Sequence, residues 1–152
     1  MDRVLLVAWR LAGLGSTMPV ARIGVSLEGP LLKAFDRLVR DGGYRSRSEA
    51  LRNLIRTSLA RRKVEAGGRA VGTVTFLYRH DVGMVTHRIL HGQHAFLRSI
   101  RASAHAHLGE ETCLEVVIME GSPQEIQKLT DRLKAVRGVL FAEAVTTSPD
   151  LP

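Results

Sequence analysis

The residues of this sequence with the clearest metal-binding chemistry are its histidines and its single cysteine. The six histidines are His80, His87, His91, His94, His105 and His107, and Cys113 follows them closely. His105 and His107 lie two residues apart in a strand-like segment, so their side chains are expected on one face. Cys113 begins the next apolar segment after a short turn, and antiparallel pairing would bring its thiol close to both imidazoles. This spacing predicts a transition-metal site with nitrogen and sulfur ligands.

The spacing does not by itself decide which metal binds. Tetrahedral sites with mixed nitrogen and sulfur ligands are typical of zinc, whereas planar nitrogen-rich sites are typical of copper or nickel. A strand with two surface histidines and an ordinary buried cysteine would give the same pattern. His87, His91 and His94 recur at helical spacing and so share one helix face, which is either a second stripe of ligands or a solvated face. The pattern gives no role to His80.

The segments that carry these donors follow a β-α-β-β-α-β order. Strands are predicted at residues 71–78, 102–108, 112–119 and 139–145, and helices at residues 85–100 and 122–136. Glu125 stands where it would complete a capping box with Ser122. This order is that of the ferredoxin-like motif. The sequence therefore predicts an α+β fold whose C-terminal part is a ferredoxin-like domain.

A smaller unit precedes that domain. Ile23, Val25 and Leu27 alternate with polar or small residues, which predicts a short strand at residues 22–27. Two helices should follow, the first ending near the glycines after Asp41 and the second beginning at the capping-box pattern of residues 46–49. A single short strand is unstable in water, so its simplest partner is the same strand of a second subunit. The pattern predicts a dimeric ribbon-helix-helix unit.

The positive charge of the chain is concentrated in this unit. Residues 20–63 hold 11 Lys and Arg against 4 Asp and Glu, whereas residues 64–152 hold 9 against 10. A two-stranded ribbon fits the major groove of double-stranded DNA, and the free N–H groups of a helix N-terminus suit a phosphate. The candidate DNA contacts are Arg22, Gly24 and Ser26 on the strand and Arg45, Ser46 and Arg47 at the second helix. A helical dimerisation unit with solvated basic faces is the alternative.

These patterns divide the chain into five parts. They are an N-terminal extension at residues 1–19, a DNA-binding unit at 20–63, a linker at 64–70, a metal-binding domain at 71–147 and a frayed tail at 148–152. The apolar start of the extension is interrupted by Arg10 and lacks a signal-peptide cleavage motif, so Met18 is the expected natural start, with a genuine apolar appendage as the alternative. There is no run of 18 apolar residues, and one cysteine excludes an intrachain disulfide. We expect a cytoplasmic protein.

The combination of motifs from Arg22 to Val145 resembles the nickel-responsive ribbon-helix-helix repressor family. The matching stretches are RIGVSL, GGYRSRSEALRNLI, FLYRH and QHAFLRSIRASAHAHLGEETCLEV, and the pattern H-x10-H-x-H-x5-C is present as His94, His105, His107 and Cys113. The resemblance implies a homotetramer, a dimer of dimers with a core of regulatory domains flanked by DNA-binding dimers. It also implies a square-planar Ni(II) site, with His94 supplied by a neighbouring chain. Nickel would then favour binding to a palindromic operator, and expression of nickel uptake genes would fall.

The sequence departs from the family at several positions. In the family, an acidic pair on the second DNA-binding helix often holds a bridging cation. Here Glu49 matches the first member of the pair, but Asn53 stands where the second carboxylate is expected, which puts that site in doubt. Gly24 stands where threonine is common, so the operator sequence is expected to differ. Gln93 and Glu115 are candidates to orient a ligand imidazole by accepting its second N–H.

Other functions stay open from the residues alone. The same architecture could sense Co, Cu or Zn, or a small amino acid with the histidines incidental. An enzyme is disfavoured because no nucleophile–base–orienter set is present, and because four protein ligands would leave a square-planar ion no open position.

Overall fold

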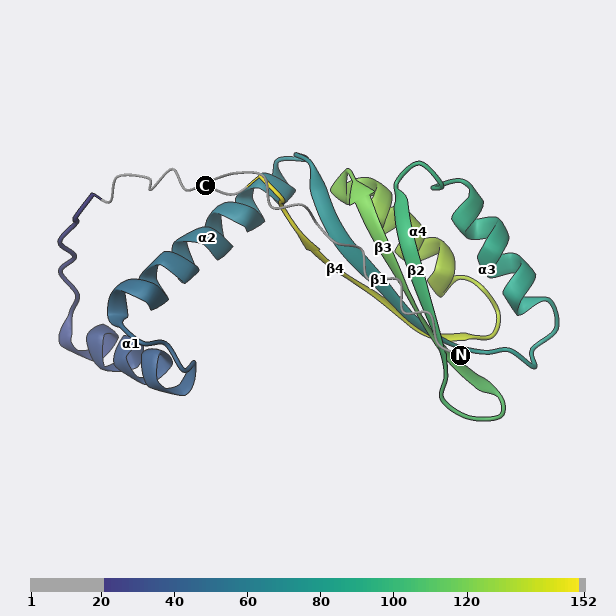
Figure 1. The fold of residues 1–152 in the computed structure, drawn as a ribbon, viewed down its shortest axis with the longest axis horizontal. Coiled ribbons are helices and arrows are strands. Elements are labelled where there is room, and N and C mark those ends of the chain that lie inside the picture. The colour runs from purple at the N-terminus through teal and green to yellow at the C-terminus, as the bar shows by residue number, and fades with distance from the viewer. Residues whose placement is uncertain (1–20, 151–152) are drawn as a thin grey trace, which may run out of the picture.

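The computed structural model describes residues 21–150, so the predicted extension at residues 1–19 lies outside it. The elements are α1 (Gly29–Asp41), α2 (Arg47–Glu65), β1 (Ala70–Arg79), α3 (Val85–His94), β2 (Ile100–His107), β3 (Thr112–Gly121), α4 (Pro123–Lys134) and β4 (Val139–Thr147). Helices α1 and α2 form an N-terminal unit, and the remaining elements form a sheet with two helices (Figure 1). None of the described helices combines the length and apolar character needed to cross a membrane.

The four strands form one antiparallel sheet in the order β2-β3-β1-β4. This order follows from two β-α-β units joined by a hairpin, and it confirms the predicted ferredoxin-like arrangement. Helices α3 and α4 lie on one face of the sheet (Figure 1). Helix α3 ends at His94 rather than near residue 100, because residues 95–99 turn the chain back toward β2 and bury Phe96 and Ser99 on the way.

The core of this domain lies between the sheet and its two helices. Its largest fully buried side chains are Val74, Phe76, Val85, Cys113, Val117, Met119, Ile126, Leu129, Thr130 and Leu133. The predicted capping box opens α4: the Ser122 hydroxyl accepts from the Glu125 N–H, and the Glu125 carboxylate accepts from the Ser122 N–H at 2.8 Å. The Ser122 N–H, the Ser122 hydroxyl and the Ser99 hydroxyl all donate to the Glu125 carboxylate, and these hydrogen bonds hold the pKa of Glu125 below its usual value.

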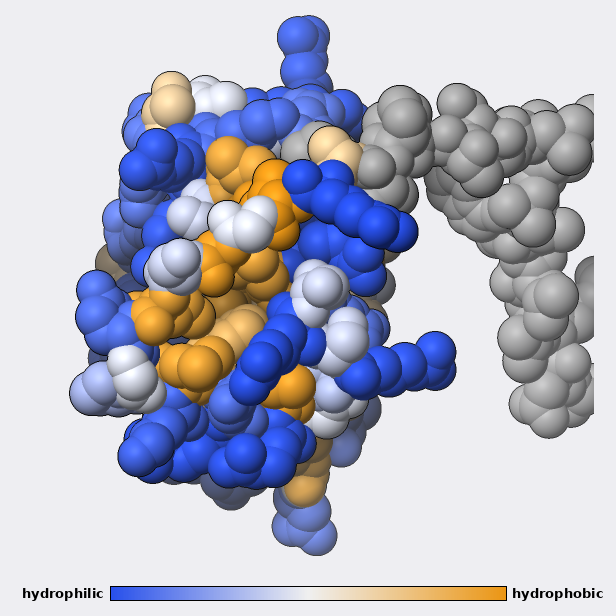
Figure 2. Space-filling view, turned by 90° about the vertical axis from the view of Figure 1, so that its left-hand side faces the viewer, coloured by the Kyte–Doolittle hydropathy of each residue, from blue (hydrophilic) through white to orange (hydrophobic). Residues whose placement is uncertain are grey.

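The N-terminal unit leaves most of its apolar side chains exposed. Ala50 and Ala60 are the buried residues of α2, and α1 has none. Residues 21–28 form no regular secondary structure, so the predicted strand at residues 22–27 does not form in the single chain. The physical reason is the one that the sequence suggests: a strand needs a partner strand, and no described segment of this chain supplies one here. Figure 2 views this end of the molecule and shows an apolar patch ringed by hydrophilic side chains.

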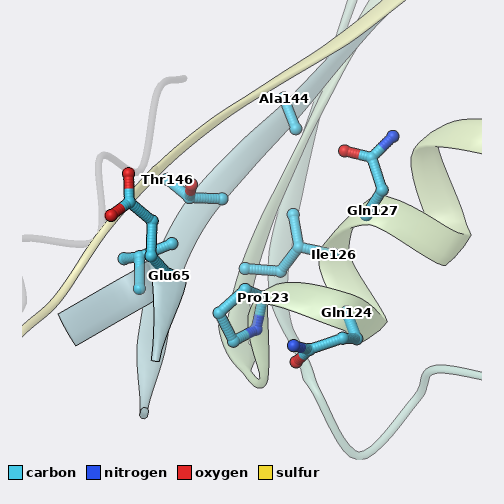
Figure 3. A pocket seen from close by; sticks show the side chains of 8 residues that line it. Glu65, Pro123, Gln124, Ile126, Gln127, Ala144 and Thr146 are labelled. Carbon is cyan, nitrogen blue, oxygen red and sulfur yellow. The ribbon is translucent and has the colours of Figure 1, made fainter. Parts of the chain in front are cut away.

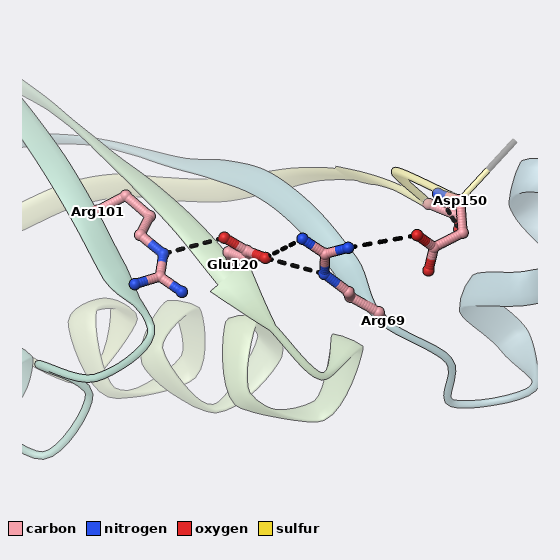
Figure 4. Close-up of polar contacts among 5 residues, drawn as sticks. Arg69, Arg101, Glu120 and Asp150 are labelled. Atoms are coloured by element: carbon pink, nitrogen blue, oxygen red, sulfur yellow. Dashed lines mark hydrogen bonds and ion pairs between the residues drawn. The ribbon is translucent and has the colours of Figure 1, made fainter.

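The junction between the two units is shorter than predicted. Helix α2 continues to Glu65, so only residues 66–69 separate it from β1, where a linker at 64–70 was predicted. Arg69 pairs with Glu120 of β3 and with Asp150, and Arg101 of β2 donates to Glu120 at 3.0 Å (Figure 4). Residues 148–150 belong to the predicted frayed tail, and in the structure Ser148 is 2% exposed and Lys63 of α2 donates to the Asp150 carbonyl.

Candidate functional site

The β2–β3 hairpin brings three of the predicted metal ligands together. In the strand register His107 lies opposite Cys113, and His105 lies opposite Glu115, so both imidazoles and the thiol share one face. The His107 Nδ1 atom is 3.3 Å from the Cys113 Sγ atom, and the rings of His105 and His107 are 4.8 Å apart between centroids. Cys113 is 1% exposed whereas both histidines are exposed, so the thiol lies at the bottom of the site and the imidazoles form its accessible side.

Tyr78 is a residue of this site that sequence reasoning missed. Its hydroxyl lies 3.3 Å from Nδ1 of His105, and its backbone pairs with Cys113 across β1 and β3. Burial raises the pKa of Tyr78 to about 12, and the negative charges of Glu115 and Cys113 add to the effect. The hydroxyl therefore stays protonated near neutral pH and can hold the His105 ring. The sequence signal that could have indicated its position is the alternation of Val74, Phe76 and Tyr78, which places all three side chains on the same, buried face of β1.

The fourth predicted ligand, His94, stands apart from the other three. It is the last residue of α3 and its side chain is exposed. Among the described residues, the donor group whose ligand atoms lie within 4.8 Å of one another contains His107 and Cys113 but neither His94 nor His105. The preceding residue, Gln93, donates from Nε2 to Oε1 of Glu115 at 2.9 Å. The other Glu115 oxygen lies 3.9 Å from Nδ1 of His105. The two residues predicted to orient ligands thus contact each other, and they connect the end of α3 to the hairpin.

His80, for which the sequence pattern predicts no role, lies beside the hairpin ligands. The donor atoms of His80, His107 and Cys113 all lie within 4.8 Å of one another. His80 directly follows β1, and the sheet order places β1 beside β3, which carries Cys113. Strand order, which periodicity alone does not give, was needed to find this neighbour. His87 and His91 remain exposed on α3.

The donor set fits a transition metal. Two or three imidazoles around one thiolate are ligands of intermediate softness, which nickel, copper, zinc and cobalt accept and which calcium and magnesium do not prefer. In contrast, the hollow of about 350 Å³ between the end of α2, the start of α4 and β4 is lined by no histidine or cysteine (Figure 3). The metal chemistry of the described residues is therefore concentrated at the β2–β3 hairpin.

The predicted DNA contacts are exposed, but the guanidinium group of one of them, Arg47, is already paired with a carboxylate of the same chain. Arg22, Gly24, Ser26 and Arg45 are exposed. Ser46 caps α2 by accepting from the Glu49 N–H at 3.1 Å, whereas the Glu49 carboxylate accepts from the Arg45 N–H rather than completing the capping box at Ser46. Arg47 is engaged in a two-point ion pair with Asp36 at 2.7 and 2.8 Å, which ties α2 to α1 and lowers the pKa of Asp36.

The two residues at the doubtful bridging-cation site, Glu49 and Asn53, both form hydrogen bonds within the chain. The Asn53 side-chain oxygen accepts a hydrogen bond from the Tyr44 hydroxyl at 3.1 Å. Glu49 already binds the Arg45 N–H. Both groups are therefore used within the chain, which agrees with a weakened cation site.

Comparison with known proteins agrees with these features. Residues 71–147 match the family described as NikR C terminal nickel binding domain, and residues 21–62 match the ribbon-helix-helix protein, copG family. A protein of Thermococcus kodakarensis assigned as a nickel-responsive regulator is 42% identical over 131 residues, covering 86% of this chain and 95% of that protein. Relatives with the same assignment are 39% identical in Pyrococcus abyssi, covering 86% of this chain and 96% of theirs, and 38% identical in Trichlorobacter lovleyi, covering 85% and 94%.

These matches span both units and agree with the resemblance seen in the motifs. The C-terminal domain is a nickel-binding domain, the N-terminal domain is a DNA-binding ribbon-helix-helix domain, and the family regulates transcription rather than catalysing a reaction. The chain belongs to the nickel-responsive regulator family.

Proposed function

We propose that this protein is a nickel-dependent repressor whose Ni(II) ion is held by His105, His107 and Cys113 of one chain and by His94 of the partner subunit. The observation that carries the proposal is the division of the donors. The hairpin gathers three of them, while His94 stays exposed at the end of α3. Strand β2 is at the edge of the sheet, and its outer side pairs with no other described strand. A second chain can therefore approach the site from that side.

A ligand supplied by a second chain links metal occupancy to assembly. Nickel supplies the bonds that join the two chains at this point, so the ion favours those arrangements in which both chains are correctly placed. The Gln93–Glu115 hydrogen bond supports this role, because it fixes the last turn of α3 against the strand that faces His105. Positioning of His94 and of the hairpin ligands is then coupled through the protein itself.

The exposed apolar surface of the N-terminal unit supports the DNA-binding half of the proposal. A groove there is lined by Ile23, Val25, Leu27, Leu31, Leu32, Phe35, Leu51 and Leu54, among others. The same segment of a second copy would cover it and pair the two strands at residues 22–27. Four chains would form a homotetramer, with two such dimers on a core of metal-binding domains. Nickel would favour binding of both dimers to a palindromic operator in the cytoplasm, and nickel uptake genes would be repressed.

The first test is a Ni(II) titration of the apo-protein, read by absorption and by a mobility shift on its own upstream DNA. We expect a thiolate-to-nickel charge-transfer band that saturates at one ion per chain, with operator binding appearing in parallel. Absence of the band, with DNA binding unaffected by metal, would contradict the proposal. Cobalt, copper and zinc are titrated beside nickel, since affinity alone would favour copper.

Substitution of the ligands tests the site itself. We expect His94→Ala, His105→Ala, His107→Ala and Cys113→Ala to abolish nickel-dependent operator binding with the circular dichroism spectrum unchanged. His87→Ala, which removes an exposed histidine of α3 outside the ligand set, is the matched control. Normal nickel responses in all four variants would mean that other residues hold the ion, which would contradict the proposed ligand set.

A further inference from the structure

The junction between α2 and β1 contains two consecutive glycines, Gly67 and Gly68. Glycine leaves the backbone free to rotate, so this composition alone would let the N-terminal unit move relative to the metal-binding domain. Part of the restraint is local: the Gly67 N–H donates to the Val64 carbonyl at 2.9 Å. The Gly68 N–H donates to the Lys63 carbonyl at 3.0 Å. Val64 also packs against the core of the metal-binding domain, so the last turn of α2 is seated on that domain.

The C-terminal segment at residues 148–150 supplies a second restraint. Ser148 is buried, and its hydroxyl accepts from the Asp150 N–H at 3.2 Å, which fixes the end of the segment to its buried part. The Asp150 carbonyl accepts from Lys63 of α2. The Asp150 carboxylate pairs at 3.3 Å with Arg69, the last residue before β1 (Figure 4). One residue from the far end of the chain thus contacts both sides of the junction.

The same contacts continue into the sheet that carries the hairpin ligands. Nε of Arg69 donates to Oε1 of Glu120 on β3 at 2.8 Å, and Arg101 of β2 donates to the other Glu120 oxygen at 3.0 Å (Figure 4). The hydrogen bonds from these two arginines hold the pKa of Glu120 below its usual value, so its carboxylate stays charged near neutral pH. Strand β2 also carries His105 and His107. A continuous row of charged groups therefore connects α2 to the strand of the proposed metal site.

We propose that residues 148–150 act as a strap that holds the DNA-binding unit in one orientation on the metal-binding domain. The strap lies within one chain and needs no metal, so it goes beyond the proposed function. The side chains of Arg69 and Asp150 are 55% and 52% exposed. Exposed ion pairs contribute little individually and are weakened by salt. The strap therefore biases the orientation of α2 without locking it. A movement of β2 on metal binding would reach α2 along this row, and that part rests on the proposed function.

The strap has a defined consequence for DNA binding. A unit that is already oriented loses less freedom on binding DNA than a unit that rotates about two glycines. Release of the strap should therefore lower operator affinity. Nickel affinity should stay the same, because none of the described contacts of the strap involves His94 or a hairpin ligand.

The test is hydrogen–deuterium exchange of the full-length apo-protein, measured by mass spectrometry on peptides that span residues 62–70. The variants are Asp150→Lys, which repels Lys63 and Arg69, and Asp150→Asn, which removes the ion pair and leaves the backbone carbonyl in place. Asp131→Lys makes the same change of charge at an exposed position of α4 and is the matched control. Circular dichroism checks each fold. Use of the apo-protein keeps this measurement independent of the proposed nickel response.

We expect the junction amides to exchange about fivefold faster in Asp150→Lys, as for the loss of exposed ion pairs. Asp150→Asn should show a smaller increase, and Asp131→Lys should stay within about twofold of the wild type. Salt at about 1 M should accelerate exchange in the wild type and bring it toward Asp150→Lys, because screening weakens the same ion pairs. An unchanged exchange rate in Asp150→Lys would overturn the strap.

Operator affinity at saturating nickel tests the consequence for DNA binding. Asp150→Lys should bind the operator about fivefold more weakly than Asp131→Lys, which carries the same net charge. The nickel charge-transfer band should titrate as in the wild type. Equal operator affinities in the two variants would overturn the role of the strap in DNA binding. Loss of any nickel response in the wild type would instead contradict the proposed function and leave the exchange result as it stands.

Discussion

The two domains of this chain differ in how much of their structure a single copy completes. The metal-binding domain packs a continuous core between its sheet and two helices, and the end of β1 and the β2–β3 hairpin bring donor atoms of His80, His107 and Cys113 within 4.8 Å of one another. In the N-terminal unit, Ile23 is 71% exposed and Leu31 51%, and residues 21–28 form no strand. One copy is thus sufficient for the core of the metal-binding domain, whereas one copy of the N-terminal unit leaves its apolar residues uncovered, and a second copy covers them in the proposed assembly.

The largest expected effect comes from a charge placed in the exposed apolar groove. Val25→Asp should lower operator affinity at least about 100-fold, because covering an unpaired carboxylate with a second copy costs several kcal/mol. Analytical ultracentrifugation should show a smaller assembly, while the nickel charge-transfer band is retained. Ser26→Ala, which changes a neighbouring residue of the same groove without adding a charge, should keep the assembly intact. An unchanged assembly in Val25→Asp would mean that the groove is not an interface.

A cavity made in the core of the metal-binding domain should lower the stability of that domain within a single chain. Leu129 of α4 is 0% exposed, so Leu129→Ala should lower the free energy of unfolding by about 2–5 kcal/mol. Leu97 of the same domain is 63% exposed, and Leu97→Ala should change it by less than about 0.5 kcal/mol. Denaturant unfolding monitored by circular dichroism measures both. Equal costs for the two variants would show that this core is not formed as described.

Removing one positive charge should change the salt dependence of operator binding only when that charge lies in the N-terminal unit. Arg45→Ala should reduce the slope of log affinity against log salt concentration by about 1, since one phosphate contact is lost. Arg132 lies on α4 against the Phe96 ring, so Arg132→Ala removes the same charge from the other domain and should leave the slope unchanged. A mobility-shift series over salt concentrations compares them. A reduced slope for both variants would mean that DNA contacts extend beyond the N-terminal unit.

The smallest effect concerns the capping box of α4 and depends on pH. The pKa of Glu125 is lower in the folded chain than its usual 4.5, so its ionised form stabilises the fold above that pH, and the contribution disappears as pH falls through the lowered value. Glu125→Gln should cost about 1 kcal/mol of unfolding free energy near neutral pH. The difference from the wild type should vanish once the pH has fallen below the lowered pKa of Glu125. A difference that persists in acid would assign the cost to something other than the charge.

Local patterns were sufficient for most of the fold. The β-α-β-β-α-β order, the capping box at Ser122 and the two N-terminal helices are all confirmed, because each depends on periodicity and end signals within about twenty residues. Two boundaries differ between the sequence prediction and the structure. Helix α2 extends two residues into the predicted linker, and residues 148–150 are held by Lys63 and Arg69, which no local pattern reveals.

The site was predictable to the extent that it lies in one hairpin. The two-residue spacing of His105 and His107 and the turn before Cys113 placed these three side chains on one face, as the strand register shows. Tyr78 lies on β1 and His80 directly follows it, so their proximity to the hairpin depends on strand order rather than on spacing. Arg47 was predicted to contact DNA, but in the structure it forms an ion pair with Asp36 on another helix. Contacts between elements were the part that sequence patterns could not provide.

The short junction between α2 and β1 has a consequence for how the assembly searches DNA. Four residues separate the two elements, which limits the connection to about 14 Å when fully extended. In the proposed tetramer, a dimer bound at one half-site would confine the second dimer to a small volume near the other half-site. The effective concentration of that second arm would be high, so the operator would be retained through avidity, and a change in the geometry of the metal-binding core would alter retention without changing any contact to a base.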